Sequence, residues 1–164
     1  MYSQGSWREK EITKLVSRGH ELANHCKYDH EYHERAIDEF ERDLDETNGF
    51  LSKLNGGNRT VRWFRAPSGK MTSAMSAVVK KKGLKHVMLD AYSNDCHIPD
   101  PSFIAATILR AVSDGSVVII HFPERGFREW NLESTRLVLE GLRAKGLRSV
   151  GLSELGAAAM KKEN

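Results

Sequence analysis

The sequence predicts an α/β fold, in which helices alternate with the strands of a parallel sheet. Short apolar segments that end in polar residues alternate with longer amphipathic segments, as they do in βα units. The run of four β-branched residues over 117–120 is typical of a strand buried on both faces. With 164 residues, 40% of them hydrophobic and 29% charged, we expect a single globular domain over residues 1–164.

The first half of the chain predicts two helices and two strands. Residues 7–18 read as a helix whose apolar face ends before Gly19, and residues 20–25 then read as a strand. Apolar residues three, four or seven positions apart predict a long helix over about 33–54. After a turn rich in Asn and Gly, the second strand follows over 61–65.

The second half continues the alternation and brings the expected sheet to about five parallel strands. The last strand leads into Leu152-Ser153-Glu154-Leu155, which reads as a strand-to-helix ending. The expected elements are helices over 71–82, 102–113 and 131–145 and strands over 84–89, 117–120 and 147–150.

Charge and hydropathy argue against nucleic acid and membrane partners. The net charge of +3 comes from 25 basic and 22 acidic residues. The one tight basic run, Lys80-Lys81-Lys82, ends an expected helix, where the helix dipole favours cations. No segment has the eighteen apolar residues of a membrane helix, and residues 1–6 have no signal-peptide pattern, so we expect a cytoplasmic protein for the chain as written.

The expected strand ends carry polar residues that suit a catalytic or metal site. In parallel α/β folds the functional side chains gather at the carboxyl ends of the strands. His25 with Asp29 or His30 could bind one divalent cation such as zinc, although a polar stretch of this kind also occurs as a solvated loop. His121 follows the buried strand, where it is either an acid–base group or a hydrogen-bonded histidine at the edge of the core.

Two further polar residues at these ends allow more than one reading. Arg65 could hold a carboxylate in its fork or lie on the surface before a turn. Asp95 could pair with an imidazole or cap the loop that precedes Pro99.

Taken together and in order, these segments resemble the polysaccharide deacetylase family, also called the NodB homology domain or carbohydrate esterase family 4. The resemblance covers nearly the whole chain. It rests on four segments similar to the family's GHE(I/L)xNH, RxPxG, aspartate and LxH motifs, which are Gly19-His20-Glu21-Leu22-Ala23-Asn24-His25, Arg65-Ala66-Pro67-Ser68-Gly69, Asn94-Asp95 and Ile119-Ile120-His121.

The resemblance implies a distorted (β/α) barrel and a metal-dependent hydrolase that removes N-acetyl groups from a chitin- or peptidoglycan-like carbohydrate. By this resemblance His121 is the general acid and Asp95 tunes it, while Arg65 orients the catalytic base. His25 is a metal ligand, and zinc is the expected metal. Further family-implied residues beside the substrate or its oxyanion are Pro67, Ser68 and Tyr92.

Three departures from the family pattern matter. The position of the usual second histidine holds Asp29, which we favour over His30 as the second ligand because one subgroup of the family has an aspartate there. The usual tyrosine of the third motif is replaced by Ser68, which keeps a backbone donor but removes an aromatic wall. The family's TFDDGP-like first motif is absent, so we expect a domain truncated at its N-terminus, little activity from this form, and an open sheet edge through which the chain could self-associate.

Two other functions stay open on the sequence. The chain could be a noncatalytic carbohydrate-binding or regulatory protein that keeps the groove. It could also be an unrelated metal hydrolase with a local site built from Asp29, His30 and His33 together with His25. Replacing His121 separates this last reading from the deacetylase, because only the deacetylase needs that residue in its mechanism.

The two cysteines do not form a disulfide framework. Cys26 and Cys96 each directly follow a proposed site residue, so they could lie near each other. Two free thiols are the expectation for so few cysteines.

Overall fold

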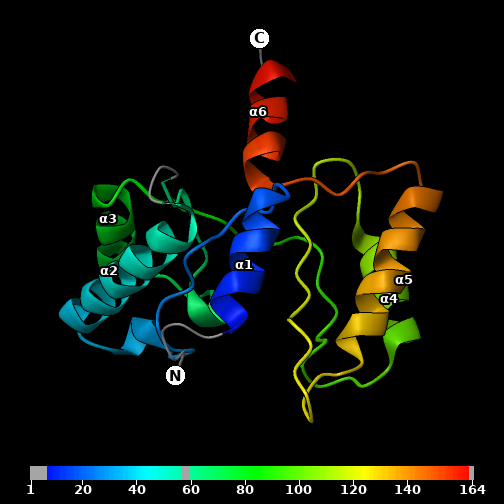
Figure 1. Cartoon of the computed structure of the whole chain (residues 1–164), viewed down its shortest axis with the longest axis horizontal. Coiled ribbons are helices and arrows are strands. Elements are labelled where there is room, and N and C mark those ends of the chain that lie inside the picture. Colours follow the sequence, from blue (N-terminus) through cyan, green and yellow to red (C-terminus); the bar gives the residue numbers. More distant parts are fainter. Residues whose placement is uncertain (1–6, 57–59, 163–164) are drawn as a thin grey trace. The chain divides into compact units, whose positions relative to one another are not determined.

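A computed structural model describes residues 7–56 and 60–162 of the chain (Figure 1). The chain divides into two compact units, residues 1–88 and residues 89–164, each with its own core. The single domain predicted over 1–164 stays a prediction.

The first unit carries three helices and a small parallel sheet. The 3-10 turn η1, which precedes the second helix, ends at Glu34, and the backbone of Arg35 after it is extended. The elements in chain order are α1 (Trp7–Ser17), η1 (Tyr32–Glu34), α2 (Ile37–Leu54), β1 (Trp63–Phe64), η2 (Pro67–Gly69), α3 (Ser73–Lys81) and β2 (Lys85–His86). The predicted helix over 33–54 therefore begins later than expected, at Ile37.

The sheet of the first unit is centred on β1. It pairs in parallel with β2, with Phe64 opposite His86. On its other side, Phe64 forms a parallel bridge with Asn24, whose backbone N–H donates to the Trp63 carbonyl at 2.8 Å. The predicted strand over 20–25 is thus present only as this one bridging residue.

An aromatic stack fills the core between the sheet and the helices of the first unit. Phe40 on α2 lies edge-on between Tyr32 and Phe64, with ring centroids 5.7 and 5.8 Å apart. Phe40 and Phe64 have no exposed surface. The amphipathic helix and the strand that begins with Val61 therefore bury most of the apolar residues that defined them, whereas Ile37 at the start of the helix is 40% exposed.

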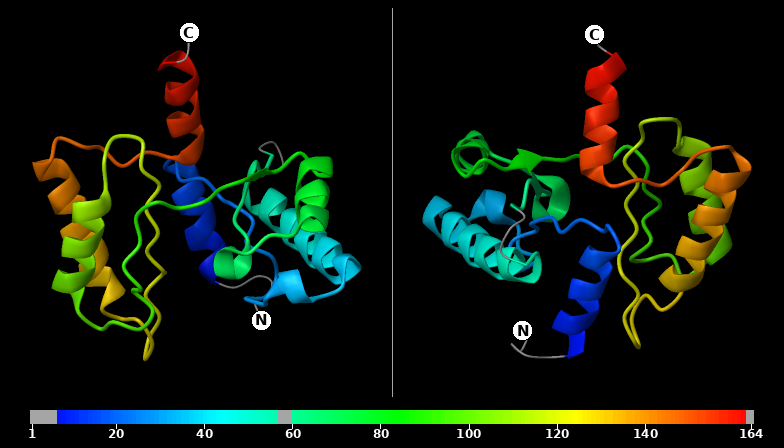
Figure 2. Two further views of the ribbon diagram at one scale, coloured as in Figure 1. Left: turned by 180° about the vertical axis from the view of Figure 1, so that it is seen from behind. Right: turned by 45° about the horizontal axis from the view of Figure 1, so that its top comes forward.

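The second unit is built on a pair of adjacent helices, and its strands are reduced to a bridge. Its helices are α4 (Pro101–Ala111), α5 (Asn131–Ala144) and α6 (Leu152–Lys162), and α4 lies alongside α5 in every view (Figures 1 and 2). The Asp100 side chain caps α4 by accepting from the Phe103 N–H at 3.0 Å. Ala91 forms a parallel bridge with Val118.

Close packing of α4 on α5 depends on Gly141. A Cβ atom at this position would overlap the end of the Leu109 side chain. Ile104 and Ile108 on α4 and Val138 and Leu142 on α5 are buried in the same core. The predicted helices over 102–113 and 131–145 are confirmed to within two residues at each end.

The prediction of about five parallel strands is not confirmed. Within residues 7–56 and 60–162 the structure has one two-stranded parallel sheet plus isolated bridges. Residues 117–120 are only half-buried rather than enclosed on both faces, and the predicted strand over 147–150 is wrong. In that last segment Leu147 packs against the core, but its backbone N–H donates to Leu142 at 2.9 Å instead of to a neighbouring strand.

The basic run at the end of α3 has a structural partner. Lys82 lies 2.5 Å from Asp45 and 3.0 Å from Glu41, and Lys81 lies 3.5 Å from Glu41; both acids lie on α2. Two of the three lysines, Lys81 and Lys82, therefore connect the end of α3 to α2 through ion pairs. No helix in the described part of the chain is long and apolar enough to cross a membrane.

Candidate functional site

The first unit places His25 next to a fully buried anchor, Asn24. The Asn24 side chain donates to the Leu44 carbonyl at 3.0 Å and to Asn48 at 2.8 Å, both on α2. Its oxygen accepts from the Cys26 N–H at 2.8 Å. Because its backbone also pairs with β1, Asn24 fixes the point at which the chain leaves the sheet, and His25 follows directly.

His25 and Arg65 meet, although they lie forty residues apart in the sequence. His25 Nδ1 lies 2.6 Å from the Arg65 carbonyl oxygen, and a carbonyl can only accept, so Nδ1 carries the proton. Nε2 is then the ring nitrogen with a lone pair, and it accepts from the Arg65 guanidinium at 2.9 Å. A backbone carbonyl that fixes the tautomer is the usual companion of a metal-binding imidazole.

The two candidates for a second ligand lie in different surroundings. Asp29 is exposed in the loop after His25. The His30 ring stacks on Tyr28, with centroids 4.9 Å apart, and its Nδ1 lies 3.8 Å from Glu39 on α2. His30 Nδ1 is buried without a hydrogen-bond partner among the described residues, so these contacts leave the choice between Asp29 and His30 a prediction.

The predicted oxyanion segment forms a tight turn after β1. Pro67 is buried and begins η2, whereas Ser68 is exposed. Ser68 has φ +56° and ψ 0°, in the left-handed region that costs a residue with a Cβ atom free energy. Gly69, the next residue, takes φ +73°. The turn therefore holds Ser68 in a conformation that an unconstrained serine rarely adopts.

The second unit brings Asp95 and His121 together. His121 Nδ1 lies 2.8 Å from Asp95 Oδ1, and the His121 backbone N–H donates to Asp95 Oδ2 at 2.6 Å. Burial by itself raises the pKa of the Asp95 carboxyl, but the hydrogen bonds from His121 and Asn131 outweigh burial and hold that pKa below its ordinary value. An ionised Asp95 orients the imidazole with Nδ1 protonated. The Tyr92 ring lies edge-on to this imidazole at 6.2 Å.

Two residues that support Asp95 were missed by sequence reasoning. The Asn131 side chain, which is fully buried, donates to Asp95 Oδ2 at 2.7 Å and to the His121 carbonyl at 3.0 Å. Trp130 Nε1 donates to the Asp95 carbonyl at 2.9 Å. Both residues precede or begin α5, where an Asn reads as an ordinary helix start, so no local signal in the sequence distinguishes them.

Several residues other than glycine have a left-handed backbone conformation near these site residues. In the described part of the chain they are Cys26, Ser68, Asn94 and Arg128. Cys26 follows His25, and Asn94 precedes Asp95. Strained backbone of this kind concentrates at functional sites, because only a well-determined surrounding structure holds it.

The arrangement of potential metal ligands differs from the predicted pair. Among the described residues, the trios with ligand atoms within 4.8 Å of one another are Asp95–Cys96–His121 and Glu31–His33–Glu34. Neither trio includes His25. Both cysteines are free thiols.

The comparisons with known proteins identify the family of the chain. The family model described as polysaccharide deacetylase matches residues 2–87, which is more than half of the chain. The chain belongs to the polysaccharide deacetylase family. The matched part contains the His25 and Arg65 motifs, so the resemblance stated from those residues is confirmed.

A curated relative extends the similarity of this polysaccharide deacetylase family member into the second unit. The chain is 30% identical over 139 residues to a chitooligosaccharide deacetylase from Azorhizobium caulinodans. The match covers 78% of the chain and 65% of the relative. The chain therefore spans less than two thirds of the length of that relative.

Solved structures share the fold. An acetyl xylan esterase of family 4 from Clostridium thermocellum, in complex with a cobalt ion, has a TM-score of 0.79 and 24% identity, covering 92% of this chain and 70% of that chain. A family 4 pseudoenzyme from Bacillus anthracis has a TM-score of 0.79 and 20% identity, covering 90% of this chain and 50% of that chain. The carbohydrate esterase family 4 type of fold is thereby shown for this chain.

Proposed function

We propose that the chain is part of a metal-dependent hydrolase that removes N-acetyl groups from a chitin- or peptidoglycan-like oligosaccharide. The observation that carries this proposal is the hydrogen-bonded pair of Asp95 and His121 in a member of the polysaccharide deacetylase family. A histidine oriented by a buried carboxylate is a suitable general acid for an amine leaving group. The chitooligosaccharide deacetylase relative supports the choice of substrate.

In the proposed reaction His121 delivers a proton. Asp95 keeps the proton on Nδ1 and stabilises the imidazolium, so Nε2 is the atom that gives its proton to the departing amine. Water adds to the acetyl carbon and loses one proton to solvent, His121 protonates the nitrogen, the carbon–nitrogen bond breaks, and acetate and a free amine result. The backbone N–H of Ser68, next to the buried Pro67, is the proposed donor to the oxyanion.

His25 and Asp29 are the proposed metal ligands, with zinc as the expected ion. With Nδ1 protonated, the lone pair of Nε2 is an imidazole donor of the type that zinc and cobalt prefer, but in the structure this lone pair accepts from the Arg65 guanidinium at 2.9 Å. A divalent cation bound there would supply Lewis-acid polarisation of the acetyl carbonyl and of water. Metal binding by His25 therefore requires the Arg65 guanidinium to leave Nε2, because one lone pair cannot serve both. Arg65 would then take the role that the family resemblance implies, which is to orient the catalytic base.

Calorimetry with zinc and with cobalt tests the metal assignment. The full chain should bind either ion, His25→Ala should lose binding, and His33→Ala should keep it. Loss of binding in His33→Ala with retention in His25→Ala would place the metal at the local site around Glu31, His33 and Glu34 and sink the assignment.

Acetate release from tetra-N-acetylchitotetraose tests the reaction itself. Any turnover by the chain should fall by about a hundredfold or more in His121→Ala, the usual loss when a general acid is removed. The control is His97→Ala, because the His97 ring lies 3.1 Å from the Asn94 side chain and has no proposed part in the reaction.

The second candidate function is a noncatalytic carbohydrate-binding protein. The structural similarity to a family 4 pseudoenzyme favours considering it. Sugar binding by the full chain, with no metal binding and no acetate release, is the result that would select it.

A further inference from the structure

The turn that follows His121 exposes two phenylalanines. Phe122, the next residue, is 78% exposed, and Phe127 is 50% exposed. Aromatic side chains gain more free energy from burial than most others. Two exposed phenylalanines in one short segment therefore need a structural or functional explanation. The turn covers residues 122–130 and leads into α5.

This turn is held rigidly by its own backbone. Glu124 and Phe127 exchange both backbone hydrogen bonds, each at 2.9 Å. The Gly126 N–H donates to the Glu129 carboxylate at 2.9 Å. The turn is therefore closed at its tip and at its base.

Arg128 locks the turn to the loop that carries Asp95. Its backbone has φ +59°, and its side chain is only 15% exposed. The guanidinium donates to Glu124 at 2.8 Å and to the Cys96 sulfur at 3.5 Å, and it lies 4.4 Å from the centre of the Phe127 ring. The Arg128 guanidinium covers one side of the Phe127 ring, so the exposed surface of Phe127 belongs to the remainder of the ring.

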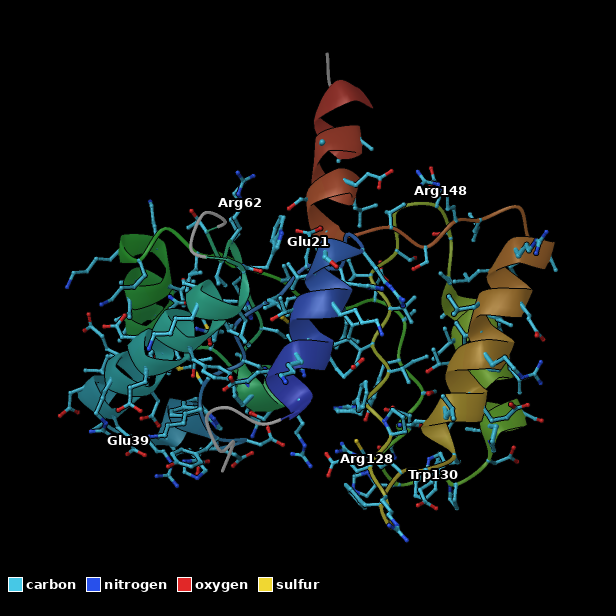
Figure 3. The ribbon with its side chains drawn as sticks, viewed as in Figure 1. Glu21, Glu39, Arg62, Arg128, Trp130 and Arg148 are labelled. Atoms are coloured by element: carbon cyan, nitrogen blue, oxygen red, sulfur yellow. The ribbon has the colours of Figure 1, made fainter. Side chains whose placement is uncertain are left out.

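Both ends of the turn are tied to the Asp95–His121 pair. Phe122 is bonded to His121, and Trp130 at the other end donates to the Asp95 carbonyl at 2.9 Å. Figure 3 labels Arg128 and Trp130 on the segment that leads into α5. A ligand whose reacting group lies at His121 would therefore lie close to the turn that carries both phenylalanines.

We propose that this turn is a stacking platform for a pyranose ring of an N-acetylated oligosaccharide, with Phe122 and Phe127 as its contact surfaces. The proposal rests on the proposed function. One face of a pyranose presents C–H groups of partial positive charge, which suit the electron-rich face of an aromatic ring. Because Arg128 and the paired backbone already hold the turn, little conformational entropy is lost on binding.

Binding of tetra-N-acetylchitotetraose to the full chain tests the platform. The dissociation constant of Phe122→Ala and of Phe127→Ala should each rise about threefold to tenfold, as expected for loss of one stacking contact. Phe127→Leu should weaken binding similarly, because leucine keeps apolar volume without a π face. Leu132→Ala is the matched control, since Leu132 is 71% exposed on α5 and should leave the dissociation constant unchanged.

The result of the test of the platform can be distinguished from the result of the test of the hydrolase activity. Binding that is unchanged in both phenylalanine variants, or absent in the wild type, overturns the platform, and circular dichroism of each variant checks that it is folded. Loss of metal binding in His25→Ala and of acetate release in His121→Ala would stand whatever the platform does. Conversely, the full chain could bind the oligosaccharide in a way that depends on Phe127 and yet release no acetate. That result would support the platform and refute the proposed hydrolase activity.

Discussion

Removing the Asp95 carboxylate should destabilise the second unit strongly. Asp95 has no exposed surface and accepts three N–H groups, at 2.6, 2.7 and 2.8 Å. In Asp95→Ala the donors of His121 and Asn131 lose this partner, and a hydrogen bond to a charged group contributes about 1.5–3 kcal/mol. Urea unfolding followed by circular dichroism measures the loss directly.

Asp95→Asn should cost less and should change the histidine instead. The asparagine oxygen can still accept the two N–H groups that bond to Oδ2 in the wild type, the His121 backbone N–H and the Asn131 side chain. The asparagine nitrogen then faces His121 Nδ1. The ring must then move its proton to Nε2, and the lost charge assistance amounts to about 1–2 kcal/mol. Long-range proton–nitrogen NMR reads the tautomer.

The pH dependence has a definite sign. The folded-state pKa of Asp95 is depressed, so its stabilisation is complete above the ordinary value of 3.8 and declines as pH falls through the lower folded-state pKa. The stability difference between wild type and Asp95→Asn should therefore shrink on acidification. Asp100→Asn is the control, because this exposed helix cap accepts one N–H and asparagine caps as well as aspartate.

Two results would refute this reasoning. One is an Asp95→Ala variant whose free energy of unfolding lies within about 0.5 kcal/mol of the wild-type value, the range of ordinary surface substitutions. The other is an Asp95→Asn variant in which His121 keeps its proton on Nδ1.

Three further predictions concern other parts of the chain. Asn24→Ala should lower the free energy of unfolding by about 2–4 kcal/mol in urea, because its buried side chain makes three hydrogen bonds; a smaller loss than 1 kcal/mol would contradict this. Gly141→Ala should cost about 1–3 kcal/mol by crowding Leu109, and a gain in melting temperature would show that helix propensity wins instead. Burial, followed by a nearby carboxylate, raises the pKa of the Cys26 thiol to about 12, so iodoacetamide at pH 8 should modify it about a thousandfold more slowly than free cysteine; Cys96→Ser isolates this rate, and labelling as fast as free cysteine would disprove it.

The sequence by itself determined the helices and the motif order. Helix boundaries follow from apolar spacing and from local stops such as Gly19 and Gly83, which act over a few residues. The positions of His25, Asp95 and His121 at expected strand ends could be located in the sequence, but the pairing of Asp95 with His121 was implied only by the family resemblance. The family assignment needed no tertiary information.

Only the tertiary structure decided how these residues are held. The tautomer of His25 depends on a carbonyl forty residues away, and the support of Asp95 depends on Trp130 and Asn131, more than thirty residues away. Strand length likewise depends on partners, which is why residues 20–25 and 117–120 form single bridges. Local periodicity reports which face of a segment is apolar, whereas a hydrogen bond between distant segments exists only once packing has brought its donor and acceptor within reach.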